Sequence, residues 1–272
     1  MSPRTRSGVS SRVRAVVLLI MVAGCDSVFG LNRDAVPLAD HDEDIDGIDD
    51  AIDVCPGVFD DQADGDEDEV GDACDPHPEL AVDRRAYFSS LRNFNDWSVR
   101  TGSWIQEADQ VRVASMSGNQ LAVLLSTNVL VEPTVSATLD QVTQGNANYA
   151  FGVYLVTDVG VAGGSPPGLI CYEVHRSIAG EGLEVWDART AVPVGNQVTF
   201  APYTLPLRVT LQASSGDSHL GGPPLCKGSR ANGDSNLIGP IDESVVPSAH
   251  VGLYSFHAAV TFLSVDVIDN RP

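Results

Sequence analysis

Positive charge is scarce in this sequence, and so are cysteine and long apolar runs. The chain has 16 Lys and Arg against 37 Asp and Glu, which gives a formal net charge of -21 at pH 7. This balance argues against nucleic acid as a partner, because phosphate binding needs a basic face that displaces counterions. The apolar run Ala15–Ala23 is far shorter than the about 20 residues that a membrane-spanning helix needs. Cations are the partners that such a composition favours.

The start of the chain has the layout of a cleaved secretory signal. Arginines precede the apolar run, which leads into Val22-Ala23-Gly24-Cys25, and a basic region followed by a short apolar one is typical of a signal peptide. The last four residues resemble the lipobox of bacterial lipoproteins, whose cysteine accepts a diacylglycerol anchor. The resemblance implies a signal peptide over 1–24, lipidation of Cys25, a tether over 25–39 and a place on the extracytoplasmic side of the cell envelope. An ordinary secretory signal with an incidental cysteine is the alternative, and the membrane that carries the anchor stays open.

Cysteine usage fits an oxidising compartment. Lipidation accounts for the odd one of the five cysteines, and the other four divide into one pair in each region of the chain. We therefore predict a Cys55–Cys74 bridge and a Cys171–Cys226 bridge, as is typical of extracytoplasmic proteins.

An acidic segment follows the tether. Between Asp40 and Asp75 there are 17 Asp and Glu and no Lys or Arg. Such a run is usually a solvated, disordered spacer, but here the carboxylates alternate and the same offsets recur after the first cysteine of the segment. The expected ligands are Asp42, Asp44, Asp46, Ile48, Asp50 and Asp53 in a first loop, and Asp64, Asp66, Asp68, Val70, Asp72 and Asp75 in a second.

Calcium chemistry explains this spacing. Ca²⁺ takes about six to eight oxygens, and carboxylates at the first, third and fifth positions of a tight loop converge on one point, with a backbone carbonyl from the seventh. Ile48 and Val70 therefore take the carbonyl role. Gly47 at the sixth position permits a sharp turn, whereas the second loop has Glu69 there, so that turn is made differently or the second site is weaker. We predict that the segment binds Ca²⁺ and is disordered without it.

Residues 40–78 resemble the thrombospondin type 3 repeat. The resemblance rests on the alternating aspartates, on Cys55-Pro56 and Gln62, and on the closing Gly71-Asp72-Ala73-Cys74-Asp75. Repeats of this family bind calcium through aspartate side chains and have little regular secondary structure. The resemblance therefore implies the same ligands as the spacing.

The chain after Pro78 is predicted to be all-β. Charges thin out, and short alternating apolar runs appear between Gly, Pro, Asn and Asp, which is typical of strands and turns. Strands that bury one face favour a two-sheet antiparallel sandwich. The expected strands are Trp104–Ile105, Val111–Ala114, Gln120–Leu125, Thr134–Leu139, Tyr149–Val156, Leu169–His175, Leu183–Trp186, Leu207–Gln212, His250–Phe256 and Val260–Ile268. Residues 214–247 are expected to form a long loop that Cys226 ties to a strand.

The two ends of this β region carry a further resemblance. The stretch FNDWSV followed by GSW, and the later HVGLY leading to TF and VDV, are similar to the concanavalin A-like jelly roll of the laminin G-like sort. The resemblance implies a jelly-roll domain over 85–272 in which the opening Trp-containing strand pairs with the final strand. Proteins of this fold range from sugar-binding lectins through adhesion modules to glycosidases.

Catalytic residues are not assigned. Glycoside hydrolysis needs two facing carboxylates, and the nearest candidates are Glu173, Glu181 and Glu184. A spacing of three puts Glu181 and Glu184 on opposite faces of a strand.

Aromatic and histidine side chains are the candidates for a sugar-binding face. They are Tyr172, His175, Trp186, Tyr254 and His257. Large aromatics dominate sandwich interiors, so we expect the three tryptophans, Trp186 included, to be core residues.

Three functions fit these observations. The first is a membrane-anchored, calcium-binding lipoprotein that presents a lectin-like sandwich for adhesion or glycan binding, with a glycan or an envelope protein as its partner. The second is a carbohydrate-active hydrolase acting on envelope or environmental polysaccharide. The third is a purely structural envelope protein.

Overall fold

The structure is a computed structural model, and it describes most of the chain after residue 40. The described residues are 41–92, 95, 97–114, 119–124, 129–144, 148–158, 166–176, 180–194, 198–200, 205–213, 225–230, 235–239 and 248–270. By its contacts the chain divides into two units, Met1–His41 and Asp42–Pro272, and every described strand belongs to the second. The predicted signal peptide over 1–24, the lipidated Cys25 and the tether over 25–39 lie outside the described residues.

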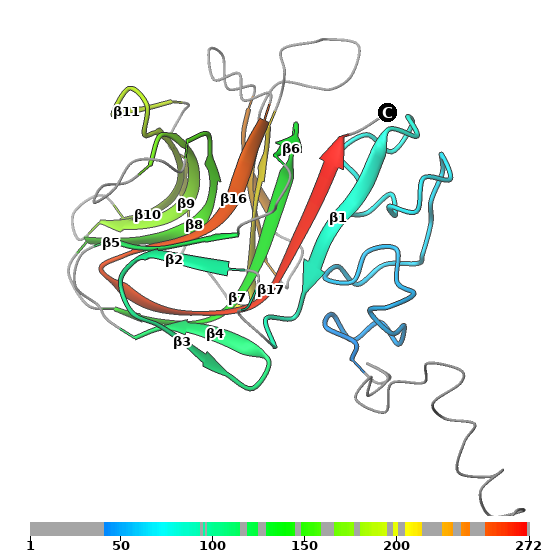
Figure 1. Ribbon diagram of the computed structural model, residues 1–272, viewed down its shortest axis with the longest axis horizontal. Helices are drawn as coiled ribbons and strands as arrows, with labels where there is room; N and C mark the ends of the chain where they lie inside the picture. The colour runs from blue at the N-terminus through cyan, green and yellow to red at the C-terminus, as the bar shows by residue number, and fades with distance from the viewer. Residues whose placement is uncertain are drawn as a thin grey trace, which may run out of the picture. The chain divides into compact units, whose positions relative to one another are not determined.

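The described residues form 17 strands and no helix, so the all-β prediction is confirmed (Figure 1). None of these residues belongs to a helix able to cross a membrane. The strands are β1 Asp83–Ser89, β2 Trp97–Thr101, β3 Trp104–Glu107, β4 Gln110–Val113, β5 Asn119–Leu124, β6 Leu130–Val131, β7 Thr134–Gln144, β8 Asn148–Val156, β9 Gly168–Arg176, β10 Gly180–Asp187, β11 Val192–Pro193, β12 Val198–Phe200, β13 Leu207–Gln212, β14 Leu225–Arg230, β15 Ser235–Ile238, β16 Ser248–Phe256 and β17 Ala258–Asn270.

Two antiparallel sheets make the predicted sandwich. The eight-stranded sheet runs β15-β14-β13-β7-β17-β4-β3, with β1 paired to β17. The nine-stranded sheet runs β11-β10-β9-β8-β16-β5-β2, with β12 on β10 and β6 on β16. The resemblance implied that the opening Trp-containing strand pairs with the final strand, and this is wrong: β2 pairs with β5 in the other sheet, and β1 is the early strand on β17.

The core fills the space between the sheets and follows the alternation of the sequence. Phe151, Val153 and Leu155 of β8 are fully buried, because every second side chain of a strand points to the same face. In β17 the core positions shift phase, so that Phe262 is followed by Val265. Register irregularities on either side of Phe262 explain the spacing of three, since a bulge inserts an extra residue and resets which face is buried.

Both predicted disulfides are present, Cys55–Cys74 in the acidic segment and Cys171–Cys226 in the sandwich. Cys226 lies on strand β14, not in a loop, because residues 214–247 contain β14 and β15; the prediction of one long loop is wrong. Since β9 and β14 belong to different sheets, the second disulfide joins the two layers. Two structural disulfides are typical of an oxidising, extracytoplasmic compartment.

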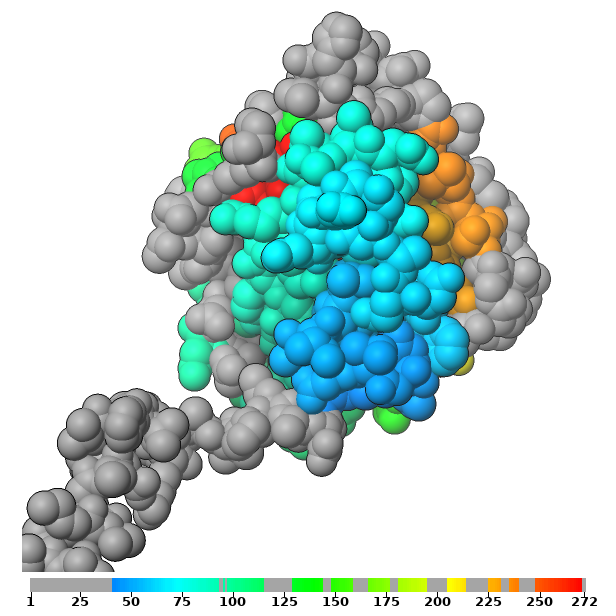
Figure 2. Space-filling view, turned by 90° about the vertical axis from the view of Figure 1, so that its right-hand side faces the viewer, coloured from blue at the N-terminus to red at the C-terminus, as the bar shows by residue number. Residues whose placement is uncertain are grey.

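Residues 42–78 of the acidic segment pack on the outer face of the eight-stranded sheet (Figure 2, blue to cyan). Arg208 of β13 donates to the carbonyl of Gly57 at 2.9 Å, and Arg85 of β1 donates to the carbonyls of Asp53 and Val54. These contacts hold the segment against the sandwich.

The sheet surface beneath the segment is polar. Thr134, Ser136 and Gln212 are at most 7% exposed, and with Thr210 they line a hollow of about 280 Å³ that also includes segment residues such as Pro76. The segment thus covers hydroxyl and amide groups of the sheet.

Candidate functional site

The acidic segment is built from two loops that repeat after 22 residues. The Asp42 carboxylate accepts a hydrogen bond from the backbone N–H of Gly47 at 2.8 Å, and the Asp64 carboxylate accepts one from Glu69 at 3.0 Å. Asp side chains that bond backbone amides a few residues away shape such turns locally. The recurrence explains why the offsets of the sequence repeat.

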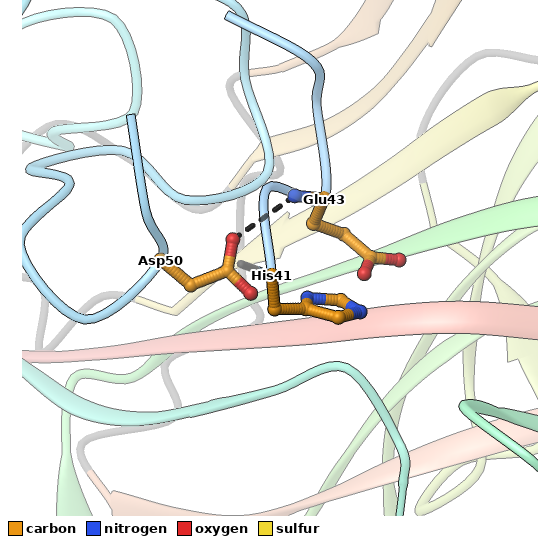
Figure 3. Close-up of side chains that lie close together, drawn as sticks. All are labelled: His41, Glu43 and Asp50. Atoms are coloured by element: carbon orange, nitrogen blue, oxygen red, sulfur yellow. Dashed lines mark hydrogen bonds between the residues drawn. The ribbon is translucent and has the colours of Figure 1, made fainter. Parts of the chain in front are cut away.

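Further hydrogen bonds obey the same offset. One of them, from the Glu43 N–H to the Asp50 carboxylate at 3.0 Å, is drawn in Figure 3. In each pair a backbone N–H donates to an aspartate carboxylate, and the second bond lies 22 residues after the first. The pairs are Ile48 to Asp46 with Val70 to Asp68, Glu43 to Asp50 with Gly65 to Asp72, and Cys55 to Asp53 with His77 to Asp75. Asp44 also accepts the backbone N–H of Asp46, at 3.1 Å, so each predicted aspartate other than Asp66 accepts a backbone amide within the segment.

The two loops also share their turn. Gly47 has φ of 96° and Glu69 has φ of 73°, so both occupy the left-handed region. The residues two positions earlier, Ile45 and Glu67, are left-handed as well. The second loop therefore makes the same turn as the first, with the less suited residue.

The carboxylates gather in clusters that can hold a metal ion, their ligand atoms within 4.8 Å of one another. The described clusters within the segment and at its junction with β1 are Asp42, Asp44 and Asp46; Asp46, Asp53 and Asp60; Asp64, Asp66 and Asp68; and Asp75, His77 and Asp83. Asp60, His77 and Asp83 lie outside the alternating pattern, so sequence reasoning missed them. The carbonyl role of Ile48 and Val70, and the ligand role of Asp50 and Asp72, stay predictions.

Several oxygens of these clusters are buried and have no hydrogen-bond donor. They include Oδ2 of Asp44, Asp53 and Asp60, and both carboxylate oxygens of Asp66. Burial, followed by neighbouring aspartates, raises the pKa of Asp44 to about 7, and burial raises the pKa of Asp60. Buried anionic oxygens without donors are costly unless a cation neutralises them. A hard divalent cation with oxygen ligands fits this donor set.

Gln62 donates its side-chain amide to all three carboxylates of the second cluster. Its Nε2 lies 2.8 Å from a carboxylate oxygen of Asp53, 2.8 Å from one of Asp60 and 3.2 Å from one of Asp46. A single amide thus holds three carboxylates in place, and it leaves Oδ2 of Asp53 and Asp60 unpaired.

A second candidate site is a hollow on the outer face of the nine-stranded sheet. Its volume is about 430 Å³, within the range of small-ligand sites, and Tyr172, Trp186, Tyr254 and Phe256 line it. Strand register places Gly152 directly between Tyr172 and Tyr254. The Tyr172 and Tyr254 rings approach each other from the two strands that flank Gly152, with their centroids 6.0 Å apart.

One ion pair defines the polar side of the hollow. Arg176 donates to both carboxylate oxygens of Glu184, at 3.0 and 2.7 Å, and the Tyr172 hydroxyl donates to the same group at 2.8 Å. Burial, then the nearby Glu184 charge, raises the pKa of Tyr172, and burial raises that of Tyr254 to about 12. Both tyrosines therefore remain hydroxyl donors at neutral pH.

Only some of the aromatic and histidine candidates for a sugar-binding face lie in the hollow. Tyr172, Trp186 and Tyr254 line the hollow, so the expectation that Trp186 is a core residue is wrong; His175 instead stacks on the core residue Tyr149, with ring centroids 4.7 Å apart. Trp97 is in the core, as expected, and Trp104 is partly buried and packs against the core. His257 lies against Phe256, with ring centroids 3.8 Å apart and the rings tilted by 31°.

The carboxylates separate as the sequence predicts. Glu184 faces the hollow, whereas Glu181 bonds His175 on the opposite face of β10. Glu173 is buried between the sheets at 1% exposure. Among the described lining residues Glu184 is the only carboxylate, so these residues do not supply the facing pair of a glycosidase.

Comparison with known proteins gives similarity of fold. No family model matches the chain, and no curated protein matches it. Carbohydrate binding module CBM66 from Bacillus subtilis matches with 12% identity and a TM-score of 0.43, over 61% of this chain and 91% of that one. The Ca²⁺/Man3GlcNAc-bound exoplasmic/lumenal domain of VIP36 matches with 11% identity and a TM-score of 0.47, over 68% and 89%. A GH43 protein from Bacillus licheniformis matches with 15% identity and a TM-score of 0.46, over 67% of this chain, and this chain spans 39% of its length.

Proposed function

We propose that the acidic segment binds calcium and that the sandwich binds carbohydrate, in a protein held by lipid at the bacterial cell envelope. The observation that carries the calcium proposal is the set of buried carboxylate oxygens without donors in Asp44, Asp53, Asp60 and Asp66. Calcium supplies the missing positive charge through oxygen coordination alone. No step of carbohydrate binding is assigned to the ion.

The clusters give each ion a ligand set. Asp42, Asp44 and Asp46 would hold one ion, and Asp64, Asp66 and Asp68 its counterpart 22 residues later, with Asp53 and Asp60 adding carboxylates beside Asp46. Because so many like charges repel, a bound cation stabilises the folded segment relative to the unfolded one.

Calorimetric titration of the EDTA-treated, disulfide-bonded protein tests the calcium proposal. We expect saturable Ca²⁺ binding that weakens in Asp44→Asn and in Asp66→Asn, because each substitution removes a carboxylate with a buried, donor-free oxygen. Asp61→Asn is the matched control, since Asp61 is exposed and belongs to none of the described clusters. Equal binding by all four proteins would exclude Asp44 and Asp66 as ligands, and no binding by the wild type would reduce the segment to an acidic spacer.

Carbohydrate binding is favoured by the aromatic hollow. Sugars stack their apolar faces on aromatic rings and hydrogen-bond to planar polar groups, and Trp186 and Tyr254 beside Arg176 offer both kinds of contact. We expect binding on a glycan array that is lost in Trp186→Ala. Phe59→Ala is the control, because Phe59 is an aromatic residue, 71% exposed, on the acidic segment. An array without hits would favour a structural role, and release of reducing sugar would favour the hydrolase.

The lipid anchor is proposed from the lipobox at Cys25. Metabolic labelling with a radioactive fatty acid tests it directly: we expect label on the wild-type protein and none on Cys25→Ser. Unlabelled wild-type protein recovered from the medium would replace the anchor with an ordinary secretory signal.

A further inference from the structure

The junction between the acidic segment and the sandwich contains a mixed cluster of nitrogen and oxygen donors. Asp75 and His77 come from the end of the segment, and Asp83 is the first residue of β1. One ligand atom from each lies within 4.8 Å of the others. His77 Nδ1 and Asp83 Oδ2 are 2.7 Å apart.

Burial at this junction is deep and leaves donor atoms unused. The Asp83 side chain is 1% exposed and that of His77 is 9% exposed. Asp83 Oδ1, Asp75 Oδ2 and His77 Nε2 are buried without a hydrogen-bond partner. Buried polar atoms are nearly always satisfied in folded proteins, so three unsatisfied atoms in one cluster indicate a ligand between or beside them.

The 22-residue repeat distinguishes this cluster from the others. In the first half of the segment, Asp53 gathers with Asp46 and Asp60. In the second half, Asp75 is the counterpart of Asp53, and Asp68 is the counterpart of Asp46. The position 22 residues after Asp60 is not an aspartate. Asp83 of the sandwich takes that place, with its backbone N–H donating to Asp68 Oδ2 at 2.9 Å.

The second half has a histidine at the position where the first half has a disulfide-bonded cysteine. His77 is the counterpart of Cys55, since the N–H of each residue bonds the aspartate two positions earlier. Calcium prefers oxygen ligands, whereas imidazole with carboxylates suits zinc and related transition metals. The donor set here therefore differs in kind from that of the calcium loops.

We infer that Asp75, His77 and Asp83 form a binding site for a divalent transition metal of the zinc class, in which Asp75 binds this metal and not the ion of the second calcium loop, and which Asp83 of the sandwich completes. Zinc bonds of about 2.0–2.2 Å place tetrahedral ligands roughly 3.3 Å apart, so side chains already within 4.8 Å of one another need only small rotations. Water supplies the fourth ligand. Because the ligands come from both the segment and β1, the bound metal fastens the segment to the sandwich.

Cobalt is a suitable probe, because Co²⁺ replaces Zn²⁺ in such sites and absorbs visible light when four-coordinate. The full-length protein carries Cys25→Ser, so that position 25 has neither a lipid nor a thiol that could bind Co²⁺, and it is treated with EDTA, saturated with Ca²⁺ and titrated with Co²⁺. We expect about one equivalent of absorbing Co²⁺, displaced by Zn²⁺ and retained in excess Ca²⁺. In His77→Gln and in Asp83→Asn the Co²⁺ affinity falls at least tenfold, as loss of a ligand requires.

His250→Gln is the matched control, because His250 also has a buried, unpaired ring nitrogen but lies on β16; its Co²⁺ affinity should be unchanged. Far-UV circular dichroism of each variant shows that the fold is retained, and His77→Gln keeps a side-chain donor for Asp83. Absorbance that survives His77→Gln, or that excess Ca²⁺ abolishes, overturns the inference. Calcium titration of the same variants is a separate readout: calcium binding without cobalt binding refutes only the inference, and cobalt binding without calcium binding refutes only the proposed function.

Discussion

Replacing Asp266 with Asn is predicted to loosen the acidic segment from the sandwich. Asp266 is 2% exposed on β17, and its two carboxylate oxygens accept hydrogen bonds from Arg85 at 3.3 Å and from Arg208 at 3.4 Å. These are the arginines that donate to the carbonyls of Asp53, Val54 and Gly57. The Asp266 carboxylate therefore orients both guanidinium groups that donate hydrogen bonds to the segment.

The magnitude follows from burial. The side chains of Arg85 and Arg208 are 18% and 14% exposed, and burial lowers the pKa of Arg208 although Asp266 raises it. Asp266→Asn keeps the size of the side chain and removes the charge, so two largely buried cations lose their shared anion. Breaking a buried ion pair in this way costs about 3 kcal/mol, and we expect the free energy of unfolding to fall by that amount.

Urea unfolding in calcium-containing buffer measures this change. Glu107→Gln is the matched control, since the Glu107–Arg112 pair has 44% and 36% exposed side chains and a pair of that kind contributes little. We also expect faster proteolysis within residues 42–78 in Asp266→Asn only. If the two variants unfold at the same urea concentration, the arginines are held by something other than Asp266 and the reasoning is refuted.

Three further substitutions test other parts of the structure. Glu173 has two buried oxygens without partners, and burial raises its pKa from 4.5 to about 8. Its protonation therefore stabilises the folded state at acidic pH, and this stabilisation is lost as the pH rises from 4.5 to about 8. Urea unfolding measured between these two pH values should show a fall in the free energy of unfolding of the wild type that Glu173→Gln lacks. A parallel loss in the variant would assign the pH dependence elsewhere. Glu69→Gly relieves a left-handed conformation and should raise stability in calcium by about 1 kcal/mol, measured by thermal unfolding; a lower midpoint would mean that the Glu69 side chain is needed. Changing Cys171 and Cys226 together to Ala opens a loop with a separation of 55 residues and should cost about 4 kcal/mol in urea unfolding, which an unchanged midpoint would contradict.

Period-two alternation was enough to predict the central strands. Strands such as β8 and β13 carry a regular apolar row because one face meets the core. Strands β1, β2, β6, β11, β12, β14 and β15 were missed. Of these, β1, β14 and β15 have few apolar residues and no regular alternation. The pairing of β2 with β5 depends on which sheet accepts each strand, which local patterns do not encode.

The candidate sites, like the strands, were predictable only where their contacts are local in sequence. The loop aspartates were predictable because their hydrogen bonds are local, within about seven residues. Asp83 joins Asp75 only because β1 packs beside the segment, so no spacing rule could find it. Trp186 was misassigned because β9 and the neighbouring strands are apolar on both faces, and alternation alone does not distinguish the core face from the face with the hollow.

The polar sheet surface beneath the acidic segment has a consequence for how the protein comes apart. Thr134, Ser136, Thr210 and Gln212 carry polar groups that water can satisfy, so detachment of the segment exposes little apolar area of the sheet beneath it. The arginine hydrogen bonds to the segment carbonyls and the metal ions that we propose then set the strength of attachment, and a chelator removes the ions. The segment can therefore be released by chelation at temperatures where the sandwich, with its own core and inter-sheet disulfide, remains folded, and unfolding should proceed in two transitions that merge when calcium is added.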